Sequence, residues 1–248
     1  MRGRHLGCII EVALARKVKE MEPRILYKTE RTLIVYFKNF LTFEAQDLLL
    51  QKLSTKVKWR QEVDDFGLQK RESFYMGDDP SCIFSYVGLE LVPNDWEVDC
   101  RAIKEKINTE LAPYISKQLQ LEEKTCYVTA CLLNYYSKGG GDIPWHWDEV
   151  RAHGIGKVVA SVSLGGPRPF ELKRRRTDDV NDGRSGPNAP TTSIALEPGS
   201  VLLMAGDAQE EFLHRVPLPE NAPDRISLTM RSIVPGFEEE LKKRGPTY

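Results

Sequence analysis

The sequence predicts an α+β protein that is mainly β, with helices in the first half and strands in the second. Two observations predict this class. Apolar residues recur at helical spacing in two stretches before residue 113. From residue 127 onward the apolar period changes to two, and turn signals such as Glu197-Pro198-Gly199-Ser200 separate the runs. Many short strands favour a sandwich or barrel, of which the double-stranded β-helix, or jelly roll, is one kind.

The first 60 residues are expected to contain one strand and one helix. The strand is the β-type run at residues 32–37, within the stretch 25–40. The helix covers residues 42–55, because Thr42 is a plausible N-terminal cap. Its apolar residues at helical spacing are Ala45, Leu48, Leu49 and Leu53.

A second helix is expected over residues 97–112, where Ile103, Ile107 and Leu111 share one face. Pro113 forces a break or a fresh start after it, since proline has no amide hydrogen to donate. The strands expected beyond it are 126–136, 157–164, 169–175, 192–196, 200–204, 211–216 and 225–233. Residues 174–191 are polar, and we expect a surface loop there.

Length and composition favour one intracellular domain without a membrane span. The net charge of -1, from 35 basic and 36 acidic residues, does not suggest a general nucleic-acid binder but allows a local basic groove. The odd count of five cysteines, with no CxxC pair, is typical of reduced, buried thiols. No apolar run approaches the ~20 residues that span a bilayer.

The chain is expected to divide into four segments and to be a monomer. These are a poorly ordered tail (1–24), an N-terminal extension with support helices (25–125), a core (126–236) and a C-terminal tail (237–248). The first 20 residues are too interrupted for a secretory signal. The nucleus or the cytoplasm is therefore the expected compartment, with a mitochondrial transit peptide as the alternative.

His146, Asp148 and His214 are candidate metal ligands. His146 and Asp148 lie two positions apart, and His214 follows 66 positions after Asp148. Residues i and i+2 of a strand face the same side, so this pair can face a metal while Trp147 packs into the core. Two histidines and a carboxylate form the facial triad of non-heme Fe(II), which leaves coordination positions open. Zinc is the competing metal.

Arg225 and Arg231 are candidates for binding an anionic co-substrate. Strict alternation over residues 225–231 puts both arginines on one strand face. At ~3.3 Å per residue their Cα atoms lie roughly 20 Å apart. The two side chains could bracket a short dicarboxylate, which a guanidinium binds bidentately. Asn134 and Tyr136 also share a face, and with the metal ligands these residues indicate 2-oxoglutarate.

The order of these motifs resembles the AlkB family of Fe(II)/2-oxoglutarate dioxygenases. The resemblance covers about residues 60–235 and implies a jelly-roll core with flanking N-terminal helices. It also implies a nucleotide-recognition lid, at Tyr75-Met76-Gly77-Asp78 and Phe84-Ser85-Tyr86-Val87-Gly88.

The resemblance implies a role for each candidate residue. His146, Asp148 and His214 would hold iron. Arg225 would pair with the distal carboxylate of 2-oxoglutarate, supported by Tyr136. Asn134 and Arg231 would lie near the metal-chelating end.

Two further segments resemble the branch of that family that repairs alkylated DNA and RNA. They are Ala208-Gln209 and His214-Arg215-Val216-Pro217. This resemblance implies oxidative demethylation of N-alkylated bases, adenine or cytosine, with Fe(II), O2 and 2-oxoglutarate. The products would be succinate, carbon dioxide and formaldehyde. A single strand is slightly favoured as substrate, because no basic helix that could clamp a duplex is visible.

Four residues are candidates for contact with the substrate. Tyr86 is expected to stack a flipped base against the ring of His146. Phe66 is either a wedge in the vacated base stack or an exposed turn residue. Arg71 is a candidate for phosphate contact, although Lys70-Arg71 stands where family lids often carry Pro-Arg. Glu149 either contacts the base edge or stays solvated.

The basic run Lys173-Arg174-Arg175-Arg176 is either a phosphate contact or a solvated face. Two other functions stay open. One is an oxygenase of the same chemistry that acts on a protein or lipid. The other is a non-enzymatic jelly-roll binding module that keeps a metal for its structure.

Overall fold

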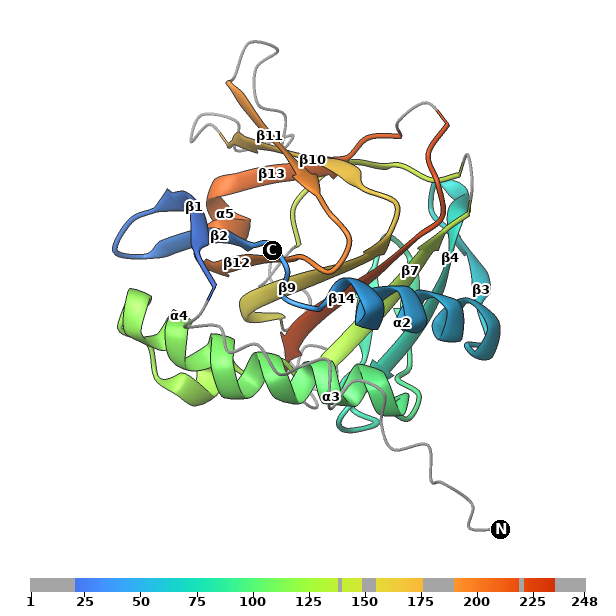
Figure 1. Ribbon diagram of the computed structural model, residues 1–248, viewed down its shortest axis with the longest axis horizontal. Coiled ribbons are helices and arrows are strands. Elements are labelled where there is room, and N and C mark those ends of the chain that lie inside the picture. Colours follow the sequence, from blue (N-terminus) through green and yellow to red (C-terminus); the bar gives the residue numbers. More distant parts are fainter. Residues whose placement is uncertain (1–20, 138–139, 149–154, 176–189, 219–220, 235–248) are drawn as a thin grey trace, which may run out of the picture.

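Two antiparallel sheets pack face to face, and helices cover the outer side of the larger one (Figure 1). The computed structural model describes residues 21–137, 140–148, 155–175, 190–218 and 221–234. Glu149, most of both expected tails and most of the expected 174–191 loop therefore lie outside the described residues. No helix in the described ranges combines the length and hydropathy needed to cross a membrane.

The larger sheet has eight strands in the order β1, β2, β12, β9, β14, β7, β4, β3. Their bounds are β1 Pro23–Lys28, β2 Thr32–Phe37, β12 Val201–Gly206, β9 Ile155–Gly165, β14 Arg225–Ile233, β7 Ala130–Tyr136, β4 Gly67–Gly77 and β3 Arg60–Asp64. Four strands precede residue 126 and four follow it. The expected N-terminal extension and the expected core thus share one sheet.

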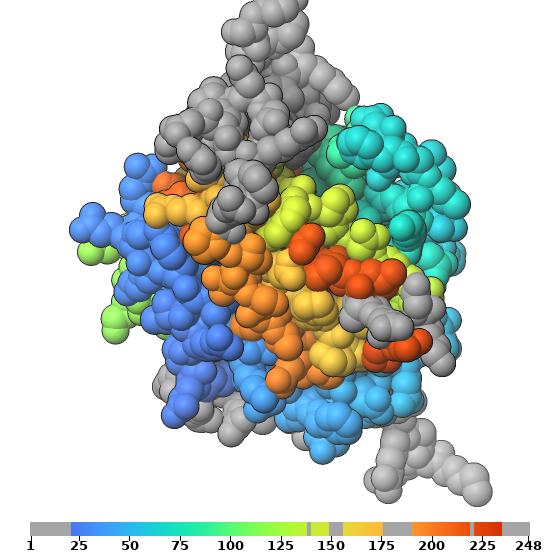
Figure 2. Space-filling model, turned by 90° about the horizontal axis from the view of Figure 1, so that it is seen from above, coloured from blue at the N-terminus to red at the C-terminus, as the bar shows by residue number. Residues whose placement is uncertain are grey.

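The smaller sheet has the order β11, β10, β13, β8. Its strands are β11 Thr191–Leu196, β10 Arg168–Arg174, β13 Phe212–Val216 and β8 Ile143–His146. A separate two-stranded ribbon joins β5 (Phe84–Tyr86) to β6 (Leu89–Leu91). Seen from the side of the smaller sheet, the N-terminal strands (blue) and the β3–β4 region (cyan) lie on opposite sides of the C-terminal strands (yellow and orange; Figure 2).

The longer helices form one layer under the larger sheet (Figure 1). Helix α2 (Phe43–Lys56) begins where Thr42 accepts a hydrogen bond from the amide of Ala45 at 3.2 Å, as a capping threonine does. It buries Ala45, Leu49 and Leu53, but Leu48 is exposed. A short helix, α5 (Ala208–Glu211), leads into β13.

Pro113 starts a new helix, the second of its two expected outcomes. Helix α3 (Val98–Lys106) passes through a π-helical turn (Ile107–Leu111) into α4 (Ala112–Leu119), with Pro113 in the first turn of α4. The amide of Ala112 bonds the carbonyl of Ile107, five residues back. This wider turn accommodates a proline that cannot donate a backbone hydrogen bond.

Strand β2 is covered on one face by the helices and on the other by the smaller sheet. All six of its residues are buried. Leu33, Val35 and Phe37 face the helices, whereas Ile34 and Tyr36 face the smaller sheet. Strands covered on both faces read as continuous apolar runs, and this is the pattern at residues 32–37.

Most of the segment 75–78, which the family resemblance placed in a lid, lies within the larger sheet. Residues 75–77 end strand β4 and pair with β7 inside the larger sheet. Tyr75 and Met76 are buried, and the Tyr75 hydroxyl donates to the carbonyl of Cys82 at 2.7 Å. The cysteines in the described ranges are free and buried, as expected for reduced thiols.

A candidate metal centre and anion site between the sheets

The three candidate metal ligands come together between the two sheets. His146 ends β8 and pairs in register with His214 of β13, and their ring centroids lie 4.1 Å apart. Asp148 lies two residues beyond the strand rather than on it, so the expected strand alternation does not orient it. One ligand atom from each of the three lies within 4.8 Å of the others, and the described ranges contain no other such group.

Both imidazoles are held in the form that binds metals. The Nδ1 of His146 lies 2.8 Å from the carbonyl oxygen of Pro144, which can only accept. Nδ1 therefore carries the proton and Nε2 keeps its lone pair. In His214 the buried Nδ1 has no hydrogen-bond partner among the described residues. Burial lowers the pKa of both rings, so both are neutral at pH 7.

Asp148 is kept ionised by a buried arginine. Arg231 Nε donates to its Oδ2 at 2.9 Å, and the backbone amide of Asp148 donates to Gln209 Oε1 at 2.9 Å. Burial alone would raise the pKa of Asp148, but Arg231 and the two histidines outweigh it and hold that pKa well below its usual range. Two neutral imidazoles and a carboxylate fit a divalent metal, Fe(II) and zinc alike.

Arg225, on strand β14 of the larger sheet, is a second buried charged group and a candidate for binding an anion. Its side chain is 1% exposed and lies over the ring of Tyr136, with 5.2 Å between the guanidinium carbon and the ring centroid. Nη2 donates to Ser163 Oγ at 3.1 Å, but Nε and Nη1 have no partner among the described residues. A buried, incompletely paired guanidinium is costly, and the carboxylate of a bound diacid would satisfy it.

Arg231 and Arg71 both contact residues at the metal centre. Arg231 is bonded to the metal ligand Asp148, at the end where the family resemblance expected it. Arg71 was expected at phosphate, but its Nε donates to Asn134 Oδ1 at 2.8 Å. Burial is the main cause of the lowered pKa of His146, and the charge of Arg71 lowers it further. Arg71 therefore belongs to the polar lining of the metal centre.

Tyr86 is linked to the centre through two stacked groups. It stacks on Phe84 with ring centroids 5.1 Å apart, and Phe84 lies 4.8 Å from the guanidinium carbon of Arg231. The Tyr86 hydroxyl also accepts from Gln69 Nε2 at 3.4 Å. The half-buried ring of Tyr86 thus stands beside the polar groups that surround Asp148.

The tip of the β3–β4 hairpin is apolar and exposed. Phe66 is 87% exposed, and Val63 and Leu68 beside it are also exposed. The Phe66 amide donates to Asp64 Oδ1 at 2.9 Å, which shapes the turn. A hydrogen bond of 3.0 Å from Asp65 to the carbonyl of Val87 joins this tip to the β5–β6 ribbon. Exposure is consistent with both expectations for Phe66, the wedge and the turn residue.

Sequence reasoning missed the residues that support the centre. Phe170 stacks on His214 with centroids 5.4 Å apart, and Gln209 bonds the backbone of Asp148. The alternation of Phe170 and Leu172 along β10 could have shown that this face points inward. Trp147 was expected in the core, but it is half-buried beneath Arg175, 4.1 Å from its ring centroid.

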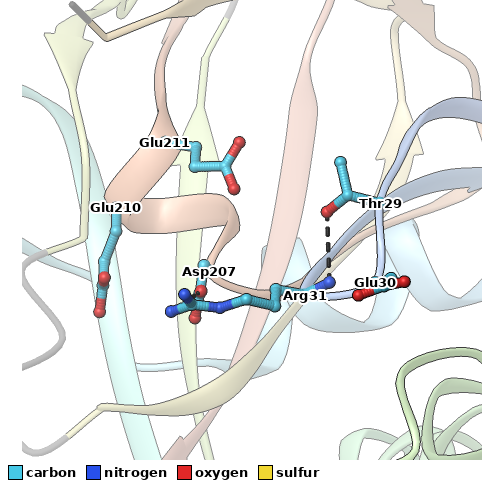
Figure 3. Close-up of a pocket in the computed structure, with 6 residues that line it drawn as sticks. All are labelled: Thr29, Glu30, Arg31, Asp207, Glu210 and Glu211. Carbon is cyan, nitrogen blue, oxygen red and sulfur yellow. Dashed lines mark hydrogen bonds and ion pairs between the residues drawn. The ribbon is translucent and has the colours of Figure 1, made fainter. Parts of the chain in front are cut away.

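A surface cavity of about 580 Å³ lies away from the three ligands (Figure 3). It is lined by Thr29, Glu30, Arg31, Asp207, Glu210 and Glu211. Asp207 pairs with Arg31 at 2.5 Å and with Lys157 at 2.9 Å. Glu211 accepts from Thr32 at 2.7 Å. Asp207, Arg31 and Glu211 thus have partners within the protein, and none of the three metal ligands lines this cavity. It is therefore not the candidate active site.

Comparison with known proteins identifies relatives of the chain. Residues 33–231 match the 2OG-Fe(II) oxygenase superfamily. DNA oxidative demethylase ALKBH2 of Arabidopsis thaliana is 27% identical over 218 residues, which are 81% of this chain. Human alpha-ketoglutarate-dependent dioxygenase alkB homolog 3 is 26% identical over 209 residues, which are 82% of this chain. In both cases the match spans 66% of the relative's own length.

A solved structure supports the fold. The structure of OsALKBH1 superposes with a TM-score of 0.53 at 21% identity, covering 84% of this chain and 100% of that one. The expected mainly β class with a jelly-roll core is confirmed, and so is the resemblance to the AlkB family.

Proposed function

We propose that this chain, which belongs to the 2OG-Fe(II) oxygenase superfamily as a member of the AlkB family, removes alkyl groups from nitrogen atoms of DNA or RNA bases. The observation that carries the proposal is the presence of two features between the same two sheets. These are the three metal ligands and the buried, incompletely paired guanidinium of Arg225. The names of the two relatives, a DNA oxidative demethylase and an alpha-ketoglutarate-dependent dioxygenase, support this substrate and this co-substrate.

The protein's own groups would hold the reactants in place. Iron and 2-oxoglutarate, when bound, supply the oxidation of the alkyl carbon by O2 and release succinate and carbon dioxide. His146, Asp148 and His214 would hold the iron, and Arg231 keeps the carboxylate ligand ionised. Arg225 would bind the distal carboxylate. Hydroxylation of an N-methyl group gives a hemiaminal, which then releases formaldehyde and the unmodified base.

The base would enter between the β5–β6 ribbon, which carries Tyr86, and the metal centre. It must leave its stack to reach buried ligands, and the exposed Phe66 at the hairpin tip is suited to filling the gap. Tyr86 offers a ring face for the extruded base, supported from behind by Phe84. Loss of the Tyr86 ring should therefore lower turnover of the nucleic acid more than it lowers binding of 2-oxoglutarate.

A basic and aromatic surface on the smaller sheet would guide the strand. Lys173 and Arg215 lie 4.4 and 4.7 Å from the ring centroid of Trp145, and Arg175 covers Trp147. Cationic groups track the phosphate backbone, and the half-buried rings of Trp145 and Trp147 pack against these groups. This local surface, on a chain of net charge -1, favours a single strand as substrate.

Mass spectrometry of methylated oligonucleotides tests the proposal. The full chain is incubated with Fe(II), 2-oxoglutarate and O2, and single and double strands carrying N-methyladenine or N-methylcytosine are compared. We expect each N-methyl group to be replaced by hydrogen, with formaldehyde and succinate released in equal amounts. Tyr86→Ala should reduce this demethylation. The matched control is Tyr127→Ala, because the Tyr127 hydroxyl binds Glu123 on the helical side of the molecule.

Two results would favour the other functions. Succinate released with methylated peptides or lipids, but not with oligonucleotides, would indicate a different substrate for the same chemistry. If no succinate were released under any condition, the remaining function would be that of a non-enzymatic binding module that holds a metal. We also propose a monomer in the nucleus or the cytoplasm, which sedimentation and cell fractionation would test.

A further inference from the structure

Arg168, at the start of β10, is a second buried arginine near Arg225. It is 1% exposed. Its two terminal nitrogens donate to backbone carbonyls, Nη1 to Pro167 at 3.1 Å and Nη2 to Pro223 at 2.5 Å, and its Nε has no partner among the described residues. No carboxylate in the described ranges lies close enough to form an ion pair with it, although the charge of Asp224 acts on it from nearby, and a buried charge normally requires a partner.

The fold places Arg168 beside the start of β14, where Arg225 lies. Arg168 shares the buried face of β10 with Phe170, and Phe170 stacks on His214, so this face points toward the larger sheet. Its contact with Pro223 joins it to the residue two positions before Arg225. Strand β14 then runs from Arg225 at this end to Arg231 at the metal ligands.

Two guanidiniums in this position leave an excess of positive charge. Burial lowers the pKa of both, and the charge of Arg168 lowers that of Arg225 further, yet arginines stay protonated in proteins. The nearby acid Asp224 is exposed and accepts a hydrogen bond from Tyr135 at 3.1 Å. It compensates only part of the charge, so an anion bound beside Arg168 and Arg225 would stabilise this region.

We propose that Arg168 supplies a second positive charge to the pocket for the distal carboxylate of 2-oxoglutarate and thereby sets the preference for a 2-oxo acid with a charged tail. This inference rests on the proposed co-substrate. Arg168 acts beside Arg225 as a specificity-determining residue, and its contact with the Pro223 carbonyl holds the segment before β14 in position.

The test compares two ligands on the Mn(II)-loaded full chain by calorimetry. 2-Oxovalerate has the same carbon chain as 2-oxoglutarate, with a methyl group in place of the distal carboxylate. The ratio of their dissociation constants measures selectivity for the charged tail. Arg168→Gln keeps an amide donor without charge, and Arg168→Lys keeps charge without the planar fork. Arg24→Met, at an exposed position of β1, is the control.

We expect Arg168→Gln to lower the selectivity ratio roughly 10- to 100-fold, the range for one hydrogen bond to a charged group. Arg168→Lys should stay within about threefold of the wild type, because lysine keeps a point charge. If Arg168 has only a structural role, both variants should bind both ligands more weakly by the same factor. The selectivity ratio would then stay unchanged, and this result would overturn the inference. If the glutamine variant does not fold, the lysine variant decides. A lysine variant that no longer prefers 2-oxoglutarate to 2-oxovalerate would also overturn the inference.

The failure of this inference and the failure of the proposed function are distinguishable. Binding is measured without nucleic acid, so an inactive oligonucleotide assay leaves this test intact. A wild-type protein that binds 2-oxoglutarate no more tightly than 2-oxovalerate would overturn both the inference and the co-substrate on which it rests.

Discussion

Arg231→Met in the metal-free protein tests the buried ion pair that orients Asp148. The two side chains are 10% and 8% exposed, and Nε lies 2.9 Å from Oδ2. Removing the guanidinium leaves a carboxylate away from water without its counter-charge. Breaking a buried pair in this way costs about 3–5 kcal/mol of unfolding free energy. For a chain of this size that corresponds to a fall in Tm of roughly 6–20 °C.

The matched control is Arg215→Met, because Arg215 forms a shorter but more exposed ion pair. Its Nε lies 2.6 Å from Glu171 Oε2, and the two side chains are 39% and 19% exposed. Solvent screens such a pair, so its loss should cost only about 0–1 kcal/mol. Burial rather than distance is therefore expected to decide which substitution destabilises the protein.

Urea unfolding in the presence of a chelator measures both effects. Arg231→Met is combined with Asp148→Asn. The double variant should lose less free energy of unfolding than the sum of the losses in the two single variants. The expected coupling is about 2 kcal/mol, within the range for contacting groups. Additive losses, or an Arg231→Met variant as stable as Arg215→Met, would refute the reasoning.

Three further predictions follow from the same contacts. Arg225→Met should weaken 2-oxoglutarate binding roughly 10- to 100-fold in calorimetry, with Mn(II) affinity unchanged; equal weakening of both would contradict the assigned role. Phe170→Ala removes the ring packed on His214 and should cost about 3–5 kcal/mol in urea unfolding and lower Mn(II) affinity. Burial alone would raise the pKa of Asp207, but Lys157 and Arg31 lower it. Its contribution to stability is therefore present above the unfolded pKa of about 3.9 and lost as the pH falls through the lowered folded value. Asp207→Asn should flatten the acid side of the stability profile, and parallel profiles would contradict this.

Local patterns in the sequence were sufficient to predict the helices and strands whose apolar residues recur at regular spacing. The helix expected at 42–55 is Phe43–Lys56, and the strand expected at 225–233 has those bounds. The candidate ligands were also recognisable, because a metal restricts the residue types and the spacing. His146 and Asp148 are two positions apart in the chain, so their proximity needs almost no tertiary information.

Contacts between distant segments were decided only by the tertiary structure. The register of β13 on β8 sets His214 beside His146, and no spacing rule predicts that register. Arg71 reaches Asn134 from a strand 63 residues earlier, and Arg231 turns to Asp148 across 83 residues.

The sequence by itself determined the chemistry of the ligands and the strand that carries Arg225 and Arg231, because both depend on short-range order along the chain. Only the folded sheets decided which charges remain unpaired. Arg168 reads as an ordinary polar residue before Pro169, but packing between the sheets buries it without an acidic partner. Burial and charge compensation are properties of the whole packing, so they cannot be read from residue order alone.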